Sequence, residues 1–366
     1  MNQSKLKSNN LVFFILAFFP VVKTITMPSI LAKYSSEGCL VSAIALILCD
    51  LLLTYAVMLA NSYRQQPLEH AIGQKYGKVV FRIFYLWYAI YFILKAFLFC
   101  CENALNLQAN LYDTAPSILI FVPFFIFSFY ASVSGIKPFF KCSAILCVLS
   151  VSSLIFIFAL TFTQCNWEDL LPLFNRPVLN YSTAIKHTLF WFDDGLYLLF
   201  ISDYIEKKGA TTKAVISTLI SSGITAIFIA MFYSVFSFIA PVKLYAATQM
   251  SKYGVINSNI LRFDQFAYLI IIFVNAFAIS IPIVIASDCL KKGLSLKGKY
   301  ISPLIINLLL ALIIIFMNNK LNVYMAFLYK YLWHIVFFTG YVLPIIVILP
   351  LYKSASTNTE PDAAEA

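Results

Sequence analysis

The chain has 366 residues, of which 61% are hydrophobic and only 11% are charged, and its mean hydropathy is +0.85. A soluble domain has roughly 45–50% apolar and about 25% charged residues, so this composition excludes a soluble enzyme with a membrane anchor. It predicts one domain immersed in lipid, and the length suits about ten transmembrane helices of about 20 residues each. The formal net charge of +10 makes nucleic acid a partner to consider.

Ten apolar runs follow one another along the chain, separated by clusters of Gly, Pro, Asn or charged residues. They cover residues 11–32, 38–60, 79–107, 116–134, 139–163, 182–204, 211–240, 263–289, 301–317 and 331–352. Together they predict a single polytopic transmembrane domain over residues 1–352. The small and polar segment 353–366 is expected to be a disordered cytoplasmic tail. The basic N-terminus and the apolar run after it resemble a signal peptide, but no small-x-small cleavage site follows, so we expect this segment to remain as the first transmembrane helix.

Lys and Arg residues are distributed unequally between alternate loops. Sixteen of the 26 lie at the termini and in the loops after even-numbered runs, eight lie in the other loops, and Lys23 and Lys95 lie inside runs. By the positive-inside rule this bias places both termini in the cytoplasm, as an even number of helices requires. The excess of basic residues therefore indicates contact with anionic lipid headgroups, and we expect no nucleic-acid partner.

The eight cysteines mostly lie inside apolar runs, without a Cys-x-x-Cys motif and without a neighbouring histidine. They predict neither a zinc site nor a disulfide framework. The sequence also lacks a nucleophile–base set, a phosphate-binding glycine loop and a cluster of metal-ligating side chains. We accordingly expect no enzyme, no metal and no cofactor.

The first and sixth runs contain residues that disfavour a continuous helix in lipid. The first includes FFPVVKTITMPS, with Pro20 and Pro28 inside the run. The sixth includes FWFDDGLYLLF, with two acids and a glycine at residues 193–195. Acids at membrane depth are unfavourable by several kcal/mol, and such a break is tolerated where it is buried in protein or lines a wet cavity. The alternative is a short loop between two separate spans.

Runs one and six of ten occupy corresponding positions in two five-helix repeats. The first run starts inside and the sixth starts outside, so the repeats are inverted. Paired discontinuous helices in such repeats indicate a binding site near the midplane, where half-helix ends hold the two charges of a zwitterion. The pattern predicts an all-α integral membrane fold with a 5+5 inverted repeat and broken helices 1 and 6.

Ionisable side chains at membrane depth form a predicted intramembrane charge network. Its members are Lys23, Asp50, Lys95 and Glu102. Lys95 and Glu102 are seven residues apart and so share one helix face. A structural ion pair explains each residue without function, and the alternative for Lys23 is a fixed charge in place of a coupling cation. One aspartate of the sixth run is predicted to pair with Lys23. On a continuous helix the two aspartates would point about 100° apart, whereas an unwound segment lets both turn toward water or partner groups. Asp→Asn is predicted to impair the response at one of the two positions and to be tolerated at the other.

Four segments resemble those of a known family. They are MPSILAKYSSEGCLVSAIALILCDLLL, KYGKVVFRIFYLWYAIYFILKA, NWEDLLPLFNRPV and FWFDDGLYLLF. Through them the chain resembles the spore-germination permease family, the B subunits of nutrient germinant receptors, within the amino acid–polyamine–organocation superfamily. The resemblance covers nearly the whole chain, up to about Leu351.

The resemblance implies a LeuT-type fold and a receptor that senses an amino acid or similar small nutrient at a midplane site. The implied partners are the larger membrane A subunit and the lipoprotein C subunit, in the spore inner membrane. An autonomous proton- or sodium-coupled amino-acid transporter is the alternative. The implied ligand contacts are Val22, Lys23, Thr24, Ile25, Thr26, Phe190, Trp191, Phe192, Asp193, Asp194 and Gly195. One departure stands out: the Gly-x-Gly of the family falls on Val21 and Lys23, where a Cβ narrows the approach of a ligand carboxylate.

Overall fold

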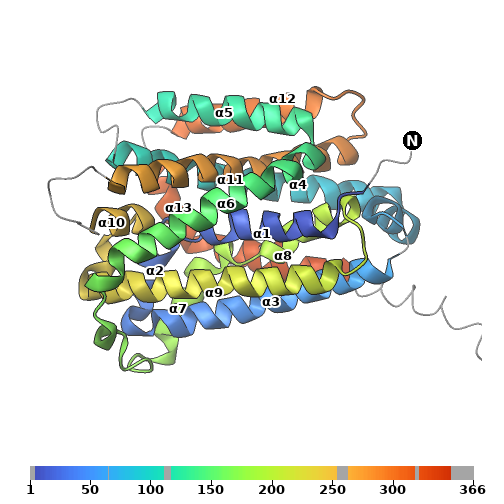
Figure 1. Ribbon diagram of the computed structural model, residues 1–366. Helices are drawn as coiled ribbons and strands as arrows, with labels where there is room; N and C mark the ends of the chain where they lie inside the picture. The colour runs from blue at the N-terminus through green and yellow to red at the C-terminus, as the bar shows by residue number, and fades with distance from the viewer. Residues whose placement is uncertain (1–4, 65, 111–116, 254–262, 318–320, 348–366) are drawn as a thin grey trace, which may run out of the picture.

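The computed structural model describes residues 5–64, 66–110, 117–253, 263–317 and 321–347. The predicted disordered tail, 353–366, lies outside these residues. Most of the described chain forms long helices that run side by side (Figure 1). The α-helices are α1 Ser8–Val22, α2 Met27–Ser35, α3 Cys39–Tyr63, α4 Leu68–Asn110, α5 Ser117–Ser134, α6 Ile136–Thr161, α7 Val178–Thr188, α8 Asp194–Ile201, α9 Ala210–Phe236, α10 Ala246–Tyr253, α11 Phe263–Gly293, α12 Ile301–Met317 and α13 Leu321–Val336.

Apolar side chains cover the outside of the bundle as well as filling its interior. Leu52, Ile126 and Ile145, for example, are 68%, 67% and 71% exposed. In the part of the chain that the structure describes, six helical segments are long and apolar enough to cross a membrane by length and composition. Shorter apolar helices occupy Ser8–Val22, Phe121–Ser134 and Ile301–Met317. Such an exterior needs lipid as its solvent, so the chain is an all-helical membrane protein.

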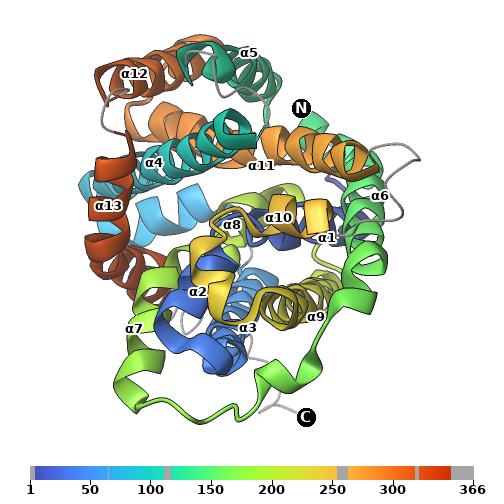
Figure 2. The ribbon, with the colours of Figure 1, turned by 90° about the vertical axis from the view of Figure 1, so that its left-hand side faces the viewer.

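The two interrupted runs lie in the interior of the bundle. Helix α1 packs against α6 and α9, and α8 packs against α3 (Figures 1 and 2). Aromatic rings fill the α1–α6 contact, where Phe14 stacks on Phe140 with their centroids 4.5 Å apart. Helix α4 packs along α11, while α5 and α12 lie beside α11 at one side of the bundle. The surrounding helices therefore keep the polar residues of the broken helices away from lipid.

Two helices begin about ten residues earlier than the apolar runs predicted. Helix α4 begins at Leu68 instead of residue 79, because the polar segment before residue 79 is also helical. Gly77, with a φ of 84°, forms a kink between this first segment and the rest of α4. Helix α13 begins at Leu321 instead of residue 331. Neither Gly nor Pro interrupts the sequence from Leu321 to Val336, so the helix continues through residues too polar to extend an apolar run. Lys330 consequently lies within α13.

One end of the bundle is tied together near the start of α1 and the end of α8. The amide of Leu6 donates to the carbonyl of Tyr204 at 2.9 Å. The Arg64 guanidinium, which follows α3, pairs with the carboxylate of Asp203. The Lys207 ammonium donates to the carbonyl oxygen of Arg64. These contacts join the chain before α1 to the ends of α3 and α8, and they hold the broken helices together at this end.

Candidate functional site

The interruption predicted in the first run is present between α1 and α2. Helix α1 ends at Val22 and α2 begins at Met27, which leaves residues 23–26 outside both helices. Pro28 occupies the first turn of α2, where the missing amide hydrogen would have no helical partner. Pro20 weakens the last turn of α1, because it cannot donate the hydrogen bond of a helix interior. The two prolines thus define the ends of the break.

The interruption predicted in the sixth run is also present, and it is buried in the protein. Helix α7 ends at Thr188, a 3-10 turn covers Leu189–Trp191, and α8 begins at Asp194. Asp193 and Asp194 are 0% and 5% exposed. The break is therefore part of the interior, in contrast to a surface loop between two separate spans.

Charged side chains from the two breaks meet each other. The Lys23 ammonium contacts the Asp194 carboxylate and lies 3.5 Å from Asp50 Oδ2 on α3. The Lys95 ammonium, on α4, pairs with the carboxylate of Asp193. Tyr91, one turn before Lys95, donates to Asp193 Oδ2 at 2.6 Å. The adjacent aspartates therefore turn to different lysines, which join four segments of the bundle.

Aromatic rings surround both buried ammonium groups. Lys23 Nζ lies 4.6 Å from the centroid of the Phe192 ring. Lys95 Nζ lies 4.7 Å from the Tyr197 centroid and 5.0 Å from the Phe190 centroid. The negative face of an aromatic ring attracts a cation, so these rings complement the aspartates in stabilising the lysines.

Asp50 caps the second half of the sixth helix. Its Oδ1 accepts the amide hydrogens of Asp194 at 2.9 Å and of Gly195 at 3.4 Å. Gly195 allows this approach, because a Cβ there would lie 2.8 Å from the Leu53 side chain and from the backbone nitrogen of Thr54. Two amide donors at the start of α8 are thus bonded to Asp50.

Backbone carbonyls of both breaks also have partners within the protein. The carbonyls of Thr24 and Ile25 accept the amides of Ala247 and Ala246 in α10, at 3.0 and 2.7 Å. The hydroxyl of Tyr341 donates to the carbonyl of Phe192. These bonds satisfy unwound backbone that would otherwise be costly to bury. Helix α10, which the sequence predicted as part of a loop, therefore supports the first break.

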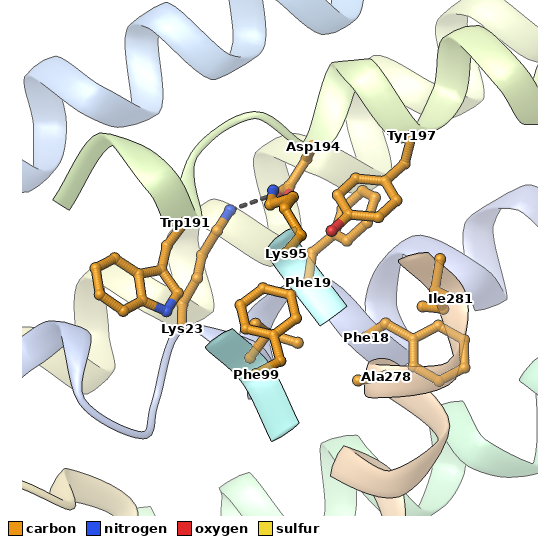
Figure 3. Close-up of a pocket in the computed structure, with 11 residues that line it drawn as sticks. Phe18, Phe19, Lys23, Lys95, Phe99, Trp191, Asp194, Tyr197, Ala278 and Ile281 are labelled. Carbon is orange, nitrogen blue, oxygen red and sulfur yellow. Dashed lines mark hydrogen bonds and ion pairs between the residues drawn. The ribbon is translucent and has the colours of Figure 1, made fainter. Parts of the chain in front are cut away.

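The predicted ligand contacts do not all face one space. A cavity of about 20 Å³ lies between the breaks, and four of them line it: Val22, Lys23, Trp191 and Asp194 (Figure 3). Its other lining residues are Phe18, Phe19, Lys95, Phe99, Tyr197, Ala278 and Ile281. This volume suffices for about one water molecule. The Lys23–Asp194 pair fills the place where the sequence predicted the two charges of a ligand.

Glu102 stands apart from the two lysines with which the sequence grouped it. Its Oε1 accepts hydrogen bonds from Thr26 at 2.8 Å and from Tyr329. Among the described residues it forms no ion pair. The physical reason is distance along α4, because seven residues place two side chains on one face but about 10.5 Å apart along the axis. The charge network therefore contains Lys23, Asp50 and Lys95, together with the two adjacent aspartates.

A larger cavity of about 510 Å³ opens at the end of the bundle where α2, α7 and α10 lie (Figure 2). Its lining includes Thr26 from the first break, Glu102 from α4 and Tyr329 from α13. A further cavity of about 650 Å³ lies between the α5–α6 junction and the α11–α12 junction, and its lining includes Asp288 and Lys291. The larger of the two contains none of the predicted ligand contacts.

Sequence reasoning missed several tyrosines of the site. Tyr91 is four residues before Lys95, so a shared helix face was a signal for it. Tyr329 and Tyr341 come from α13 and the π-helical turn after it, more than 130 residues from Trp191 and Phe192, which they contact. No local pattern in the sequence indicated them.

Comparison with solved structures shows the fold. Two mutants of the manganese transporter of Eremococcus coleocola each have a TM-score of 0.55 to this chain, at 15% and 14% identity, over 98% of this chain and 88% of that chain. The same transporter in complex with an aromatic bis-isothiourea substituted compound gives a TM-score of 0.51 at 15% identity, over 95% of this chain and 74% of that chain. The likeness shows an all-helical, LeuT-type transporter fold.

A search of curated proteins finds no match to this chain. A family model with the description "Spore germination protein" matches residues 5–323. Because the match spans most of the sequence, this multi-pass membrane protein belongs to the spore germination protein family.

Proposed function

We propose that the chain is the B subunit of a nutrient germinant receptor in the spore inner membrane. In this role it binds an amino acid or similar small nutrient near the two breaks and signals germination through A and C subunits. Family membership supports the role. The observation that carries the binding proposal is the buried Lys23–Asp194 pair, which joins the first break to the second. It is an ammonium and a carboxylate in contact, the same two groups that a zwitterionic amino acid presents.

The proposed signal is an exchange of partners at this pair. An amino acid that reaches the breaks offers its ammonium to Asp194 and its carboxylate to Lys23, and so separates the two halves that the pair now joins. The cavity of about 20 Å³ is too small for an amino acid, so binding requires the broken helices to move apart. A ligand shifts a conformational equilibrium by as much as its affinity differs between the two states. The requirement for movement therefore couples occupancy to a change that partner subunits can detect.

The proposed arrangement has ten transmembrane helices, with both termini in the cytoplasm. The α7–α8 pair acts as the sixth span, and α1 with α2 acts as the first. The tied end of the bundle, near Leu6 and Asp203, then faces the cytoplasm. The 510 Å³ cavity faces the opposite side, from which a germinant reaches a spore.

Binding to the purified protein tests this function. Radiolabelled amino acids are added to the chain in lipid nanodiscs, alone and together with its A and C subunits. We expect saturable binding of at least one amino acid, and we expect spores that lack the gene to lose their response to that same amino acid. Absence of binding in both preparations, with an unchanged germination response in the deletion strain, would contradict the proposal.

An autonomous amino-acid transporter is the second candidate, coupled to protons or sodium. The fold likeness to a manganese transporter favours it, as does a bundle that is tied at one end and hollow at the other. Uptake of a labelled amino acid into sealed proteoliposomes that contain only this chain distinguishes the two. Uptake indicates a transporter, whereas binding without uptake indicates a receptor. A neighbouring gene pair for A-type and C-type subunits also favours the receptor.

A further inference from the structure

The cavity of about 510 Å³ has one carboxyl group in its lining, that of Glu102. We name this space the α2–α13 cavity; it is lined by Thr26, Ser29, Ile30, Lys33, Tyr34, Glu102, Leu105, His187, Pro241, Leu244, Tyr245, Met325, Ala326, Tyr329 and Lys330. Its size is within the range of about 300–1,000 Å³ that is usual for small-molecule sites. Glu102 is 1% exposed, and its Oε2 has no hydrogen-bond partner among the described residues.

Glu102 differs from the other carboxylates that are buried in the described interior. Asp50, Asp193 and Asp194 each contact a lysine. Glu102 contacts no lysine: the hydroxyls of Thr26 and Tyr329 donate to its Oε1, and the indole of Trp191 is a third polar neighbour among the described residues. An ionised carboxylate has about four positions that accept hydrogen bonds, and burying one without a cation is costly. Three neighbours leave the Glu102 carboxyl group with capacity for a further donor from the cavity.

The walls next to Glu102 are suited to a cation. Trp191 stacks on the ring of Tyr329 with their centroids 5.5 Å apart. Trp191 itself lies behind this lining, with its indole next to the Glu102 carboxyl group. Tyr34 and Tyr245 add two further aromatic side chains to the lining. Aromatic faces attract an ammonium group once water is excluded.

The lining also contains two lysines, whose charge is opposite to that of an ionised Glu102. Lys33 and Lys330 are exposed, line the cavity and form no ion pair within the described part of the chain. His187 also lines the cavity, with the centroid of its ring 4.4 Å from that of Tyr34. A carboxylate is attracted to these exposed lysines, while a second ammonium is repelled by them. The charge pattern therefore matches a molecule with one ammonium and one carboxylate.

We infer that the α2–α13 cavity is a second site for a zwitterionic amino acid, separate from the Lys23–Asp194 pair, with Glu102 accepting hydrogen bonds from its ammonium group and Lys33 and Lys330 attracting its carboxylate. The choice of an amino acid rests on the proposed function. Thr26 gives this site a connection to the breaks, since its hydroxyl donates to Glu102 while its backbone lies only three residues from Lys23. A ligand on Glu102 thus acts on the segment that joins α1 to α2.

Charge removal at Glu102 tests the inference in the full chain, prepared both alone and with its A and C subunits. The probe is a panel of the common L-amino acids, and the measurement is saturation binding of each in lipid nanodiscs. For the tightest binder we expect Glu102→Gln to raise the Kd about tenfold to a hundredfold, since a hydrogen bond to a charged group is lost. Glu102→Asp should weaken binding less. Glu168→Gln, at an exposed carboxylate of the α6–α7 connection, is the matched control.

Modified ligands and a second variant separate recognition from folding. The N-acetyl derivative of the same amino acid should not compete for binding, because it has no ammonium group. The double variant Lys33→Gln/Lys330→Gln should bind the amino acid more weakly, but its affinity for the amide of that amino acid, which has no carboxylate, should not change. Thermal unfolding of each variant identifies a folding defect. Unchanged binding in Glu102→Gln, or competition by the N-acetyl derivative, would overturn the inference and leave the proposed function intact. If no amino acid binds the wild-type protein in either preparation, the proposed function and the inference fail together.

Discussion

Two lysines and three aspartates meet in the apolar interior, and their pairing explains why each is tolerated there. The sequence predicted a pair between Lys23 and one aspartate of the sixth run, and the structure has this pair at Asp194. It also gives Asp193 a lysine of its own, Lys95. The expectation that only one aspartate is sensitive to Asn gave a lysine partner to one of them alone. In the structure the break lets both turn inward to a lysine, because Asp193 precedes α8 and Asp194 begins it.

Charge removal at either aspartate is therefore expected to impair the protein. Asp193→Asn and Asp194→Asn each leave a buried lysine without its partner, and breaking a buried pair typically costs about 3–5 kcal/mol. We expect lower abundance and a lower unfolding temperature for both variants, together with loss of the germination response. Protein abundance in spore membranes and the loss of optical density of spores after nutrient addition measure the two effects. If either variant has normal abundance and a normal response, its ion pair has no role.

Removing both charges of one pair separates stability from function. Replacing a buried pair with apolar residues of similar size is often neutral or stabilising. We expect Lys23→Met alone to be unstable, and Lys23→Met combined with Asp194→Leu to regain part of the unfolding temperature, since Asp50 keeps one buried charge. The double variant should still lack the response if the pair is what a ligand displaces. A double variant that responds normally would contradict the proposed exchange of partners.

At the scale of elements, Pro20, Pro28 and the Asp-Asp-Gly triplet predicted both breaks because they act locally on a helix. The sequence did not indicate that Asp50 caps α8 or that α10 binds the carbonyls of the first break. These contacts join residues 144 and more than 200 positions apart. Such pairings follow from how the helices pack in space, and no periodicity along the chain reports them. The breaks were thus predictable, whereas the hydrogen bonds that Asp50 and α10 make to them were not.

The close packing of α3 on α8 leads to a prediction for Gly195. A Cβ at this position would meet the Leu53 side chain and the Thr54 backbone at 2.8 Å. We expect Gly195→Ala to destabilise the protein by about 1–3 kcal/mol, as overpacking does, and Gly195→Leu to be worse. The control is Gly223→Ala within α9, where a Cβ meets nothing within 4 Å. This change should be neutral or slightly stabilising, because Ala favours a helix. Thermal unfolding in detergent measures all three, and equal unfolding temperatures would refute the tight α3–α8 contact.

At the scale of the whole molecule, the two ends of the bundle differ. Hydrogen bonds and an ion pair join Leu6, Arg64 and Asp203 at one end. The α2–α13 cavity opens at the other. The positive-inside rule predicts that the tied end is cytoplasmic, which leaves the cavity accessible to a nutrient from outside. Orientation therefore decides whether the cavity can receive an external ligand.

Cysteine labelling determines this orientation. Lys208 and Asn175 are exposed, and they lie in the α8–α9 and α6–α7 connections, at opposite ends of the bundle (Figure 1). The exposed Cys49 and Cys142 are first replaced by Ser, and single cysteines are then introduced as Lys208→Cys and Asn175→Cys. In intact cells that express the protein, a membrane-impermeant maleimide should label Asn175→Cys readily and Lys208→Cys only after permeabilisation. Gln74→Cys, in the basic segment before the third span, should behave like Lys208→Cys. In the ten-span arrangement a single span, formed by α7 and α8, separates Asn175 from Lys208, so the two positions lie on opposite sides of the membrane. Labelling of Lys208→Cys and Asn175→Cys from the same side would therefore rule out ten spans.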